Sequence, residues 1–494
     1  MAQLIVHRGD TVRRFSFIAP TALADVLAEV GMSTPHPCGG RGVCGKCAVE
    51  LRGKVSAPNV QERKLGKRLS CQAILLGDAE VFLPNNDALE QIETAKQTDI
   101  TPEAPLTGKY ALVADIGTTT LAVQLYRIGS GTLLAEATER NPQTAVAADV
   151  MGRISAALHG QQQCLREMIL GALETLLRQC CAQAQLAEKD VETLVLTGNT
   201  TMLYLLTGRD PTSLSRAPFQ ADTLFGETAE ILGRQALLPP CMNAFVGADI
   251  TCAVLASRMC DVNRTALLCD IGTNGELALW HNGTLFVTST AAGPAFEGAG
   301  ISCGCGSVGG AIDRVWAENG VVRLHTIANA APIGLCGSGL IDAVAVYLAL
   351  GQIAPSGAVA PGGLSLCETV RLLPQDIRAV QLAKAAIAAG IDVLLQKAAV
   401  APQEIEAVYI AGGFGSHLHL QSAADIGLLP TELLGRMRVI GNAALSGAVE
   451  LLLSGPRRTR AAQIAAYAQH VTLSGDPLFN ERYIEHMFLG DEEE

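Results

Sequence analysis

The chain has 494 residues, of which 49% are hydrophobic and 17% charged, and its formal net charge is −12. This length exceeds what one ordinary hydrophobic core can organise, so domain-size statistics predict about three compact parts. The low charged fraction excludes a disordered chain. The negative charge argues against nucleic acid or an anionic membrane as the partner.

Targeting and membrane signals are missing from the sequence pattern. The first residues, MAQLIVHRGDTVRRF, contain no continuous apolar run of the kind that a secretory signal needs. The apolar stretch GLIDAVAVYLALGQIA is interrupted by Asp342 and is shorter than the roughly 20 residues of a membrane span. We therefore expect a cytoplasmic protein, in which the 15 cysteines are buried hydrophobic residues or metal ligands rather than disulfides.

The first elements predict a small β-grasp domain over residues 1–84. Residues 2–7 and 13–18 alternate in polarity like paired strands around a turn. The stretch TALADVLAEVGM has helical spacing, with Thr21 as the expected N-cap and Gly31 as the expected stop. A loop rich in cysteine and glycine follows this helix.

Four cysteines of this domain have the spacing C-x5-C-x2-C-x23-C: Cys38, Cys44, Cys47 and Cys71. Three thiolates can converge from the loop HPCGGRGVCGKC because its glycines permit tight backbone turns. Zinc sites usually pair their ligands as two short knuckles, so the spacing favours a [2Fe-2S] cluster; zinc and plain buried cysteines remain as alternatives. The pattern resembles that of plant-type ferredoxins, lengthened by one residue. The basic run ERKLGKR before Cys71 is either a solvated face or a docking patch for an acidic redox partner.

A polar segment without periodicity, residues 85–109, predicts a linker. After it, KYALVADIGTTTLAVQLYRI reads as a β-hairpin with a polar tip at Asp115, Gly117, Thr118, Thr119 and Thr120. Such a tip offers hydroxyl and N–H groups to phosphate, and a carboxylate to a hydrated Mg²⁺.

The hairpin pattern recurs 155 residues later in RTALLCDIGTNGELALW. The matching residues are Asp270, Gly272, Thr273, Asn274, Gly275 and Glu276. Duplication of a phosphate-binding hairpin predicts two similar halves that face one another across a cleft.

A third element is the apolar strand of IEAVYIAGGFGSHL, which runs into Gly412, Gly413 and Gly415. Glycines after a strand let the backbone approach a ligand closely, and nucleotides commonly bind at such strand ends. The spacing is not that of the dinucleotide fingerprint, so a Rossmann domain is not expected.

The two DIGT hairpins and the late AGGFG resemble the phosphate and adenosine motifs of the acetate and sugar kinase, Hsp70 and actin (ASKHA) superfamily. Together with the ferredoxin-like domain, they resemble the reductive activators of corrinoid proteins. Five further stretches fit that family: ERNPQTAVAADVMGRI, LTGNTTMLYLLTG, AGPAFEGAGISCG, LCGSGLIDAVA and IGLLPTELLGRMRVIGNAALSGA. Members of the family are often longer between the ferredoxin part and the first DIGT.

The resemblance implies an α/β fold in which the β-grasp domain is linked to an actin-like ATPase of two duplicated halves, residues 110–262 and 263–470, followed by a tail, 471–494. It implies an ATP-hydrolysing activator that passes an electron from its [2Fe-2S] cluster to a Co(II) corrinoid protein and so restores Co(I) for methyl transfer. The electron would come from an upstream ferredoxin or a flavin- or NADH-dependent reductase. The resemblance leaves open whether the protein forms a homodimer.

The resemblance also assigns roles to residues. The four cysteines would hold the cluster. The first hairpin, with Asp270, Gly272, Thr273, Asn274 and Gly275, would hold ATP and Mg²⁺, and the three late glycines would face adenosine. Asp249, in FVGADITCAVLAS, or Glu276 would orient the attacking water. Either residue can instead cap a helix or hold a neighbouring site residue in place. Two other functions stay open, an ATP-driven electron donor to another low-potential metalloenzyme and a redox-regulated, chaperone-like ATPase.

Overall fold

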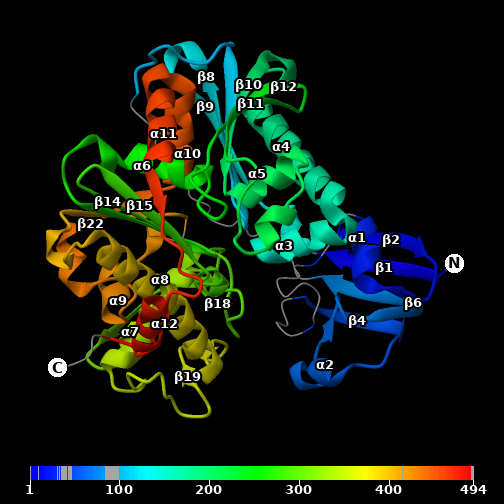
Figure 1. Cartoon of the computed structure of the whole chain (residues 1–494). Coiled ribbons are helices and arrows are strands. Elements are labelled where there is room, and N and C mark those ends of the chain that lie inside the picture. Colours follow the sequence, from blue (N-terminus) through cyan, green and yellow to red (C-terminus); the bar gives the residue numbers. More distant parts are fainter. Residues whose placement is uncertain are drawn as a thin grey trace. The chain divides into compact units, whose positions relative to one another are not determined.

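The computed structural model describes residues 2–8, 11–30, 32, 34, 42, 47–83, 100–413 and 415–490. The chain forms two compact units, Met1–Leu89 with Pro142–Ala156, and Glu90–Asn141 with Ala157–Glu494. The segment Pro142–Ala156, which contains α3 (Val150–Ala156), thus groups with the amino-terminal unit rather than with the predicted half, residues 110–262, in which it lies in the sequence. Figure 1 colours the chain from the blue amino-terminal strands to the red carboxyl-terminal helices.

The amino-terminal unit is a mixed sheet with the strand order β2-β1-β6-β4-β5, and β3 pairs with β6. β1 runs parallel to β6 and antiparallel to β2, which is the pairing expected of a β-grasp domain. Its core is formed by apolar side chains of alternating strand positions, such as Leu4, Val6 and Val81. The elements are β1 (Ala2–Arg8), β2 (Thr11–Phe17), β3 (Thr21–Ala22), α1 (Leu23–Glu29), β4 (Ala48–Val55), α2 (Val60–Leu65), β5 (Arg68–Leu69) and β6 (Ile74–Leu83).

The predicted cap of the first helix is wrong. Helix α1 begins at Leu23 with Ala22 as its N-cap, and no side chain caps it. Thr21 instead lies in β3, where it pairs with Leu75, and its hydroxyl donates to the carbonyl of Ile18. Pairing with β6 therefore takes the residue that local sequence preference assigned to the helix start. Gly31, the expected stop, lies outside the described residues.

The second unit contains two six-stranded sheets, ordered β11-β12-β10-β7-β8-β9 and β22-β21-β13-β14-β15-β23. The strands of the first sheet are β7 (Tyr110–Ile116), β8 (Thr120–Arg127), β9 (Thr132–Arg140), β10 (Val191–Gly198), β11 (Phe225–Ile231) and β12 (Arg234–Pro240). Those of the second are β13 (Ala266–Ile271), β14 (Gly275–His281), β15 (Thr284–Thr290), β21 (Ala407–Ala411), β22 (Met437–Gly441) and β23 (Ala468–His470).

Five strands of each sheet repeat the same pattern, which confirms the duplicated α/β architecture expected from the two hairpins. In both sheets the first three strands form an antiparallel meander, β7-β8-β9 and β13-β14-β15. In both, a later strand then adds in parallel beside the first one, β10 beside β7 and β21 beside β13. A further parallel strand follows, β12 and β22. The equivalent strands therefore end at equivalent edges.

The helices of this unit are α4 (Gln162–Ala184), α5 (Thr200–Thr207), α6 (Ala248–Ser257), α7 (Gly337–Ala349), α8 (Pro374–Ala398), α9 (Leu420–Asp425), α10 (Ala443–Leu453), α11 (Gly455–Tyr467) and α12 (Pro477–Glu485). Smaller strands are β16 (Ala311–Glu318), β17 (Val321–Thr326), β18 (Gly334–Leu335), β19 (Leu364–Ser365) and β20 (Arg371–Leu372). One hydrophobic cluster joins both sheets with α6 and α10. These two helices therefore link the halves.

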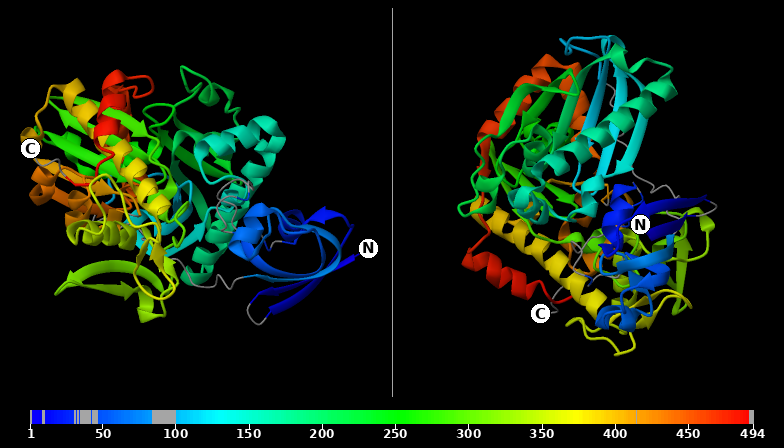
Figure 2. Two further views of the ribbon diagram at one scale, coloured as in Figure 1. Left: turned by 90° about the horizontal axis from the view of Figure 1, so that it is seen from below. Right: turned by 90° about the vertical axis from the view of Figure 1, so that its right-hand side faces the viewer.

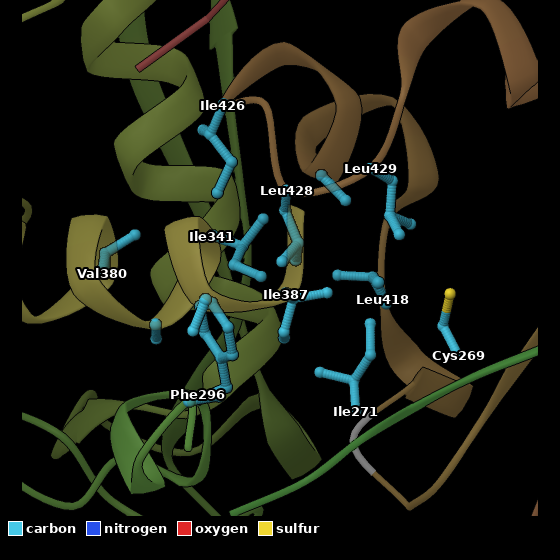
Figure 3. Packing of buried hydrophobic residues seen from close by; sticks show 14 of the residues in the cluster. Cys269, Ile271, Phe296, Ile341, Val380, Ile387, Leu418, Ile426, Leu428 and Leu429 are labelled. Atoms are coloured by element: carbon cyan, nitrogen blue, oxygen red, sulfur yellow. The ribbon is translucent and has the colours of Figure 1, made fainter. Parts of the chain in front are cut away.

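The core of the second half is built around α8 and α7. Figure 3 shows Val380 and Ile387 of α8 beside Ile341 of α7, with Phe296 packed below them. Among the described helices, α8 is the one long and apolar enough to cross a membrane, but 78% of its most apolar stretch is buried inside the protein. α12 packs along α8, as the right-hand view of Figure 2 shows. α8 thus has the character of a core helix.

The later part of the predicted linker is bound to the second unit. The N–H groups of Glu103 and Leu106 donate to the carbonyl groups of Leu453 and Leu452 at the end of α10, each at 2.9 Å. The N–H of Gly455 in turn donates to the carbonyl of Glu103 at 2.9 Å. Residues 103–106 are therefore held by backbone hydrogen bonds. The linker residues 85–99 lie outside the described part of the chain.

Substituting Gly447→Ala should lower the free energy of unfolding by about 1–3 kcal/mol. The reason is that α10 crosses α6 so closely that a methyl group at Gly447 would lie 2.0 Å from the carbonyl oxygen of Cys252. Chemical denaturation of the purified variants measures the effect. Gly171→Ala on α4 is the matched control: its added methyl meets no atom within 4 Å, so the change should be neutral or stabilise by up to ~1 kcal/mol. Equal stability of the two variants would contradict the close crossing.

Candidate functional site

The tips of the two hairpins meet in one cavity of about 260 Å³ in the second unit. The cavity is lined by most of the residues that the sequence predicted for nucleotide binding and water orientation: Asp115, Gly117, Thr118, Thr119, Thr120, Asp249, Asp270, Gly272, Thr273, Asn274, Glu276, Gly412 and Gly413. Gly275 and Gly415 are not part of its lining. Segments as far apart in the sequence as Asp115 and Ala444 thus converge on one site.

Both hairpins present their tips in the same way. β7 ends after Asp115, and the N–H of Gly117 donates to the carbonyl of Thr120 at 2.9 Å, which closes the first turn. β13 ends after Asp270, and the N–H of Gly272 donates to the carbonyl of Asn274 at 3.0 Å, which closes the second. Each aspartate therefore stands at the end of a central strand, directly before a tight turn.

A glutamate that the sequence analysis did not single out connects the two tips. The hydroxyl of Thr119 donates to Glu297 Oε2 at 2.7 Å, and the hydroxyl of Thr273 lies 3.0 Å from both oxygens of the same carboxylate. The two hydroxyl oxygens are 3.5 Å apart. Glu297 is therefore bonded to both halves at once. It lies within the stretch AGPAFEGAGISCG, but neither periodicity nor spacing marks it as a site residue.

Two asparagines at helix starts hold the first hairpin. Asn199 caps α5 by accepting from the N–H of Met202 at 2.9 Å, and its amide donates to Thr118 Oγ1 at 3.1 Å. Asn442 caps α10, and its amide donates to Asp115 Oδ2 at 3.0 Å. The sequence analysis missed both, although the repeated pattern of an apolar strand, glycine and asparagine in LTGN and VIGN is an N-cap signal.

Helix N-termini give the cavity a positive contribution that opposes its carboxylates. Asn199, Asn442 and Cys336 are the N-caps of α5, α10 and α7, and all three line the cavity. Free N–H groups at a helix start attract anions, and the helix dipole adds to this attraction. Together with the hairpin amides, this arrangement suits a phosphate chain.

Four carboxyl groups in the cavity have raised pKa values, and burial is the main cause for each. Burial raises the pKa of Asp115 to about 6, although the Asn442 hydrogen bond opposes the shift. Burial and then the charge of Asp115 raise the pKa of Asp270 to about 7. Burial followed by repulsion from Asp115 and Asp270 raises the pKa of Asp249 to about 8. The pKa of Glu276 is raised well above its usual value by burial, then by Asp249 and Asp270.

The two candidates for orienting water differ in their contacts. Glu276 Oε1 accepts a hydrogen bond from Ser289 at 3.2 Å on the neighbouring strand. Asp249 lies in the first turn of α6, and its Oδ1 accepts from the N–H of Ile250 at 2.8 Å. Both line the cavity, and no described lysine or arginine is among the groups that shift the pKa of either carboxyl group.

The late glycine loop approaches the second hairpin. Gly412 has φ +93°, and a Cβ there would lie 2.5 Å from Asp270 Oδ1, so only glycine fits between strand and carboxylate. A Cβ on Gly413 would meet no atom within 4 Å, which leaves room for a ligand. A Cβ on Gly415 would instead lie 2.9 Å from Ile410, so this glycine serves packing.

The cysteines of the amino-terminal unit are described in part. Cys47 and Cys71 bring their Sγ atoms to 3.2 Å, and neither forms a disulfide. Two thiols that converge in this way fit a shared metal centre. Cys38 and Cys44 lie outside the described residues. Within the described ranges, no group of three or more His, Cys, Asp or Glu side chains is placed to hold a metal ion directly.

Family models cover almost the whole chain. A model described as the C-terminal domain of RACo, the ASKHA domain, matches residues 264–494, and one described as the RACo middle region matches residues 110–262. A 2Fe-2S iron-sulfur cluster binding domain matches residues 9–76. The chain therefore contains the middle region of this family.

Two curated relatives match over long stretches. The "Corrinoid activation enzyme RamQ" of Eubacterium limosum is 30% identical over 585 aligned positions, covering 95% of this chain and 96% of the relative. Because this alignment is longer than the chain, the relative has segments that the chain lacks. The "[Co(II) methylated amine-specific corrinoid protein] reductase" of Methanosarcina barkeri is 25% identical and covers 76% of each chain.

A solved structure supports the fold. The structure titled "Reductive activator for corrinoid,iron-sulfur protein" matches with a TM-score of 0.72 at 24% identity, and covers 99% of this chain and 98% of its own. The ferredoxin-like domain, the duplicated ASKHA architecture and the near-complete coverage of the first relative agree with one another. The chain belongs to the RACo family of corrinoid activation proteins.

Proposed function

We propose that this protein is an ATP-dependent reductive activator, which passes an electron from a [2Fe-2S] cluster to a Co(II) corrinoid protein and so restores the Co(I) form. The observation that carries the proposal is the cavity in which two phosphate-type hairpins of a duplicated fold converge, in a chain that also contains a ferredoxin-like domain. The names of the two curated relatives support the corrinoid acceptor.

In this proposal the cavity binds ATP between the two halves. The amides and hydroxyls of the hairpin tips would hold the phosphates, and the start of α10 would lie at the same phosphate chain. Gly413 would leave room for the adenosine, and Gly412 would let the loop pass close to Asp270. Glu276 or Asp249 would orient the water that attacks the terminal phosphate in line. Closure around the nucleotide would bring the two halves together.

The carboxyl groups of the cavity fit a hydrated Mg²⁺. The charge of Asp115 raises the pKa of Asp270, and both charges raise the pKa of Asp249, so a divalent cation among the three carboxyl groups would relieve the repulsion. Mg²⁺ usually keeps several waters and is held by one or two carboxylates and the substrate phosphates, which agrees with the lack of a direct three-ligand group in the described residues. Asp115 and Asp270, at the ends of equivalent strands, are the proposed holders.

The amino-terminal unit would supply the electron carrier. Cys38, Cys44, Cys47 and Cys71 are the proposed ligands, and the cluster supplies one-electron redox chemistry when bound. Residues 1–84 contain 11 Lys and Arg against 7 Asp and Glu, in a chain whose net charge is −12. This basic part favours an acidic ferredoxin or reductase domain as the electron donor, because opposite charges speed encounter. The cytoplasm is the proposed compartment.

Coupling to ATP has an energetic reason. A plant-type cluster has a potential of about −400 mV, and each 59 mV by which a one-electron acceptor lies lower costs ~1.4 kcal/mol. A gap of roughly 100 mV therefore costs ~2.4 kcal/mol. Coupling free energies between two sites are typically ~1–3 kcal/mol, so nucleotide-driven closure is of the size required.

The test is anaerobic reduction of a Co(II) corrinoid protein by the reduced protein, followed by the absorbance of Co(I) with and without MgATP. Co(I) should form only with MgATP. Asp270→Asn should slow this formation roughly 100-fold, because it removes a carboxylate from the proposed cation site. Co(I) formation at the same rate without nucleotide would contradict the proposal.

Cys71→Ser should remove the visible absorbance of the cluster and abolish Co(I) formation, while ATP hydrolysis continues in the other unit. The matched control is Cys164→Ser, since Cys164 is an exposed free cysteine on α4. This control should keep both the cluster and Co(I) formation. Full Co(I) formation by Cys71→Ser would show that the electron takes another route.

The stability of the nucleotide-free protein should fall as the pH rises from about 5 to 8. Burial raises the pKa of Asp115, Asp270 and Asp249 above the usual 3.8 to about 6, 7 and 8, so the folded protein binds more protons than the unfolded chain in this interval. Asp249→Asn lacks the carboxyl group that loses its proton in this interval. Its free energy of unfolding, relative to that of the wild type, should therefore be higher at pH 8 than at pH 5 by on the order of 2 kcal/mol. Denaturation curves at both pH values measure this difference, and parallel behaviour of the two proteins would contradict it.

A further inference from the structure

Glu297 lies between the two hairpin tips, where the proposed function would place the terminal phosphate of ATP. It belongs to the short 3-10 helix Pro294–Glu297, not to either hairpin. Its carboxylate accepts from Thr119 at 2.7 Å and lies 3.0 Å from the hydroxyl of Thr273 through each oxygen. The first threonine belongs to one half of the unit and the second to the other.

The residue is held by the core beneath it. The preceding Phe296 is 1% exposed and belongs to the hydrophobic cluster of the second half, where Figure 3 shows it below Ile341 and Ile387. Gly298 ends the short helix with φ +74°, and a Cβ there would lie 2.5 Å from the carbonyl oxygen of Cys305. A buried aromatic anchor and a tight turn therefore flank Glu297, so its carboxylate is presented from a fixed base.

The carboxylate of Glu297 accepts hydrogen bonds from the hairpin tips as a phosphate group would. A carboxylate offers two oxygens with a shared negative charge, and the hydroxyl groups that donate to it are those that the hairpin tips would offer to a phosphate. One hydroxyl hydrogen cannot serve both acceptors. Two anions placed together among the four other carboxyl groups of the cavity would also repel one another.

We propose that Glu297 is a specificity-determining residue, which stands in for the terminal phosphate in the nucleotide-free cleft and competes with the γ-phosphate of ATP for the hydroxyls of Thr119 and Thr273. This inference rests on the proposed function, because it assumes that the cavity binds ATP. With ADP, the carboxylate keeps both hydroxyls. With ATP, the γ-phosphate accepts the hydrogen bonds of both hydroxyls and connects the two halves.

The test compares the equilibrium dissociation constants of Mg·ADP and of the magnesium complex of a non-hydrolysable imido analogue of ATP, measured by titration calorimetry. In Glu297→Gln the amide is neutral, so the γ-phosphate no longer displaces a charge. The affinity for the analogue should rise about tenfold relative to that for ADP. The affinity for ADP itself should stay within about twofold.

Two further variants sharpen the comparison. Glu297→Asp keeps the charge on a side chain that is one methylene shorter and cannot reach both threonines. The affinity for the ATP analogue relative to ADP should therefore rise here too, but by a smaller factor. Glu227→Gln is the matched control, because Glu227 is also a hydrogen-bonded glutamate of this unit but is not part of the cavity lining. It should leave both dissociation constants unchanged.

The outcomes separate this inference from the proposed function. If the wild type binds both nucleotides but the Glu297 variants keep its ratio of affinities, competition is wrong and the nucleotide site stands. Weaker binding of the analogue to Glu297→Gln would also overturn the inference, because it would assign Glu297 a favourable contact with the nucleotide or its cation. If the folded wild type binds neither nucleotide, the proposed function fails as well.

Discussion

The close crossing of α6 and α10 is the constraint on which the cavity at the hairpin tips depends. The two helices meet where Gly447 faces the carbonyl of Cys252, and both belong to the cluster that joins the two sheets. Each helix also begins at the cavity, α6 with Asp249 in its first turn and α10 with Asn442 as its cap. The packing of Gly447 against Cys252 in the core therefore sets the separation of Asp249 and Asn442 at the cavity.

The negative charge of the cavity is opposed by backbone groups and not by lysine or arginine side chains of the described lining. The charges of Asp115 and Asp270 raise the pKa of Asp249, and no described lysine or arginine belongs to the lining of the cavity. The helix starts and hairpin amides supply the opposing positive ends. A cavity of this kind suits a cation and a polyanion that enter together.

Local sequence patterns were sufficient to predict those parts of the site that are formed by residues close together in the sequence. The two DIGT hairpins could be predicted because each is a strand, a turn and a strand in sequence, and their repetition predicted the duplicated sheets. The cysteine spacing likewise identified the domain that the iron-sulfur family model matches. These signals need no knowledge of how distant segments pack.

The residues that the sequence analysis missed are those whose role comes from tertiary packing. Asn199 and Asn442 cap helices like many other asparagines, and only the fold brings their amides to Thr118 and Asp115. Glu297 follows a core phenylalanine in a loop without periodicity. Thr21 shows the opposite error, because strand pairing overrode its preference for a helix start.

The backbone hydrogen bonds of Glu103 and Leu106 give α10 a second connection. The helix has 11 residues and so spans about 16 Å, from Asn442 in the cavity to Leu452 and Leu453, which hold the entering chain. A rigid rod of this kind acts as a lever, with the cavity at one end and the attachment point of the preceding segment at the other. Any tilt of α10 that accompanies cleft closure must displace that attachment point, which is where the electron-carrying part of the protein is tethered.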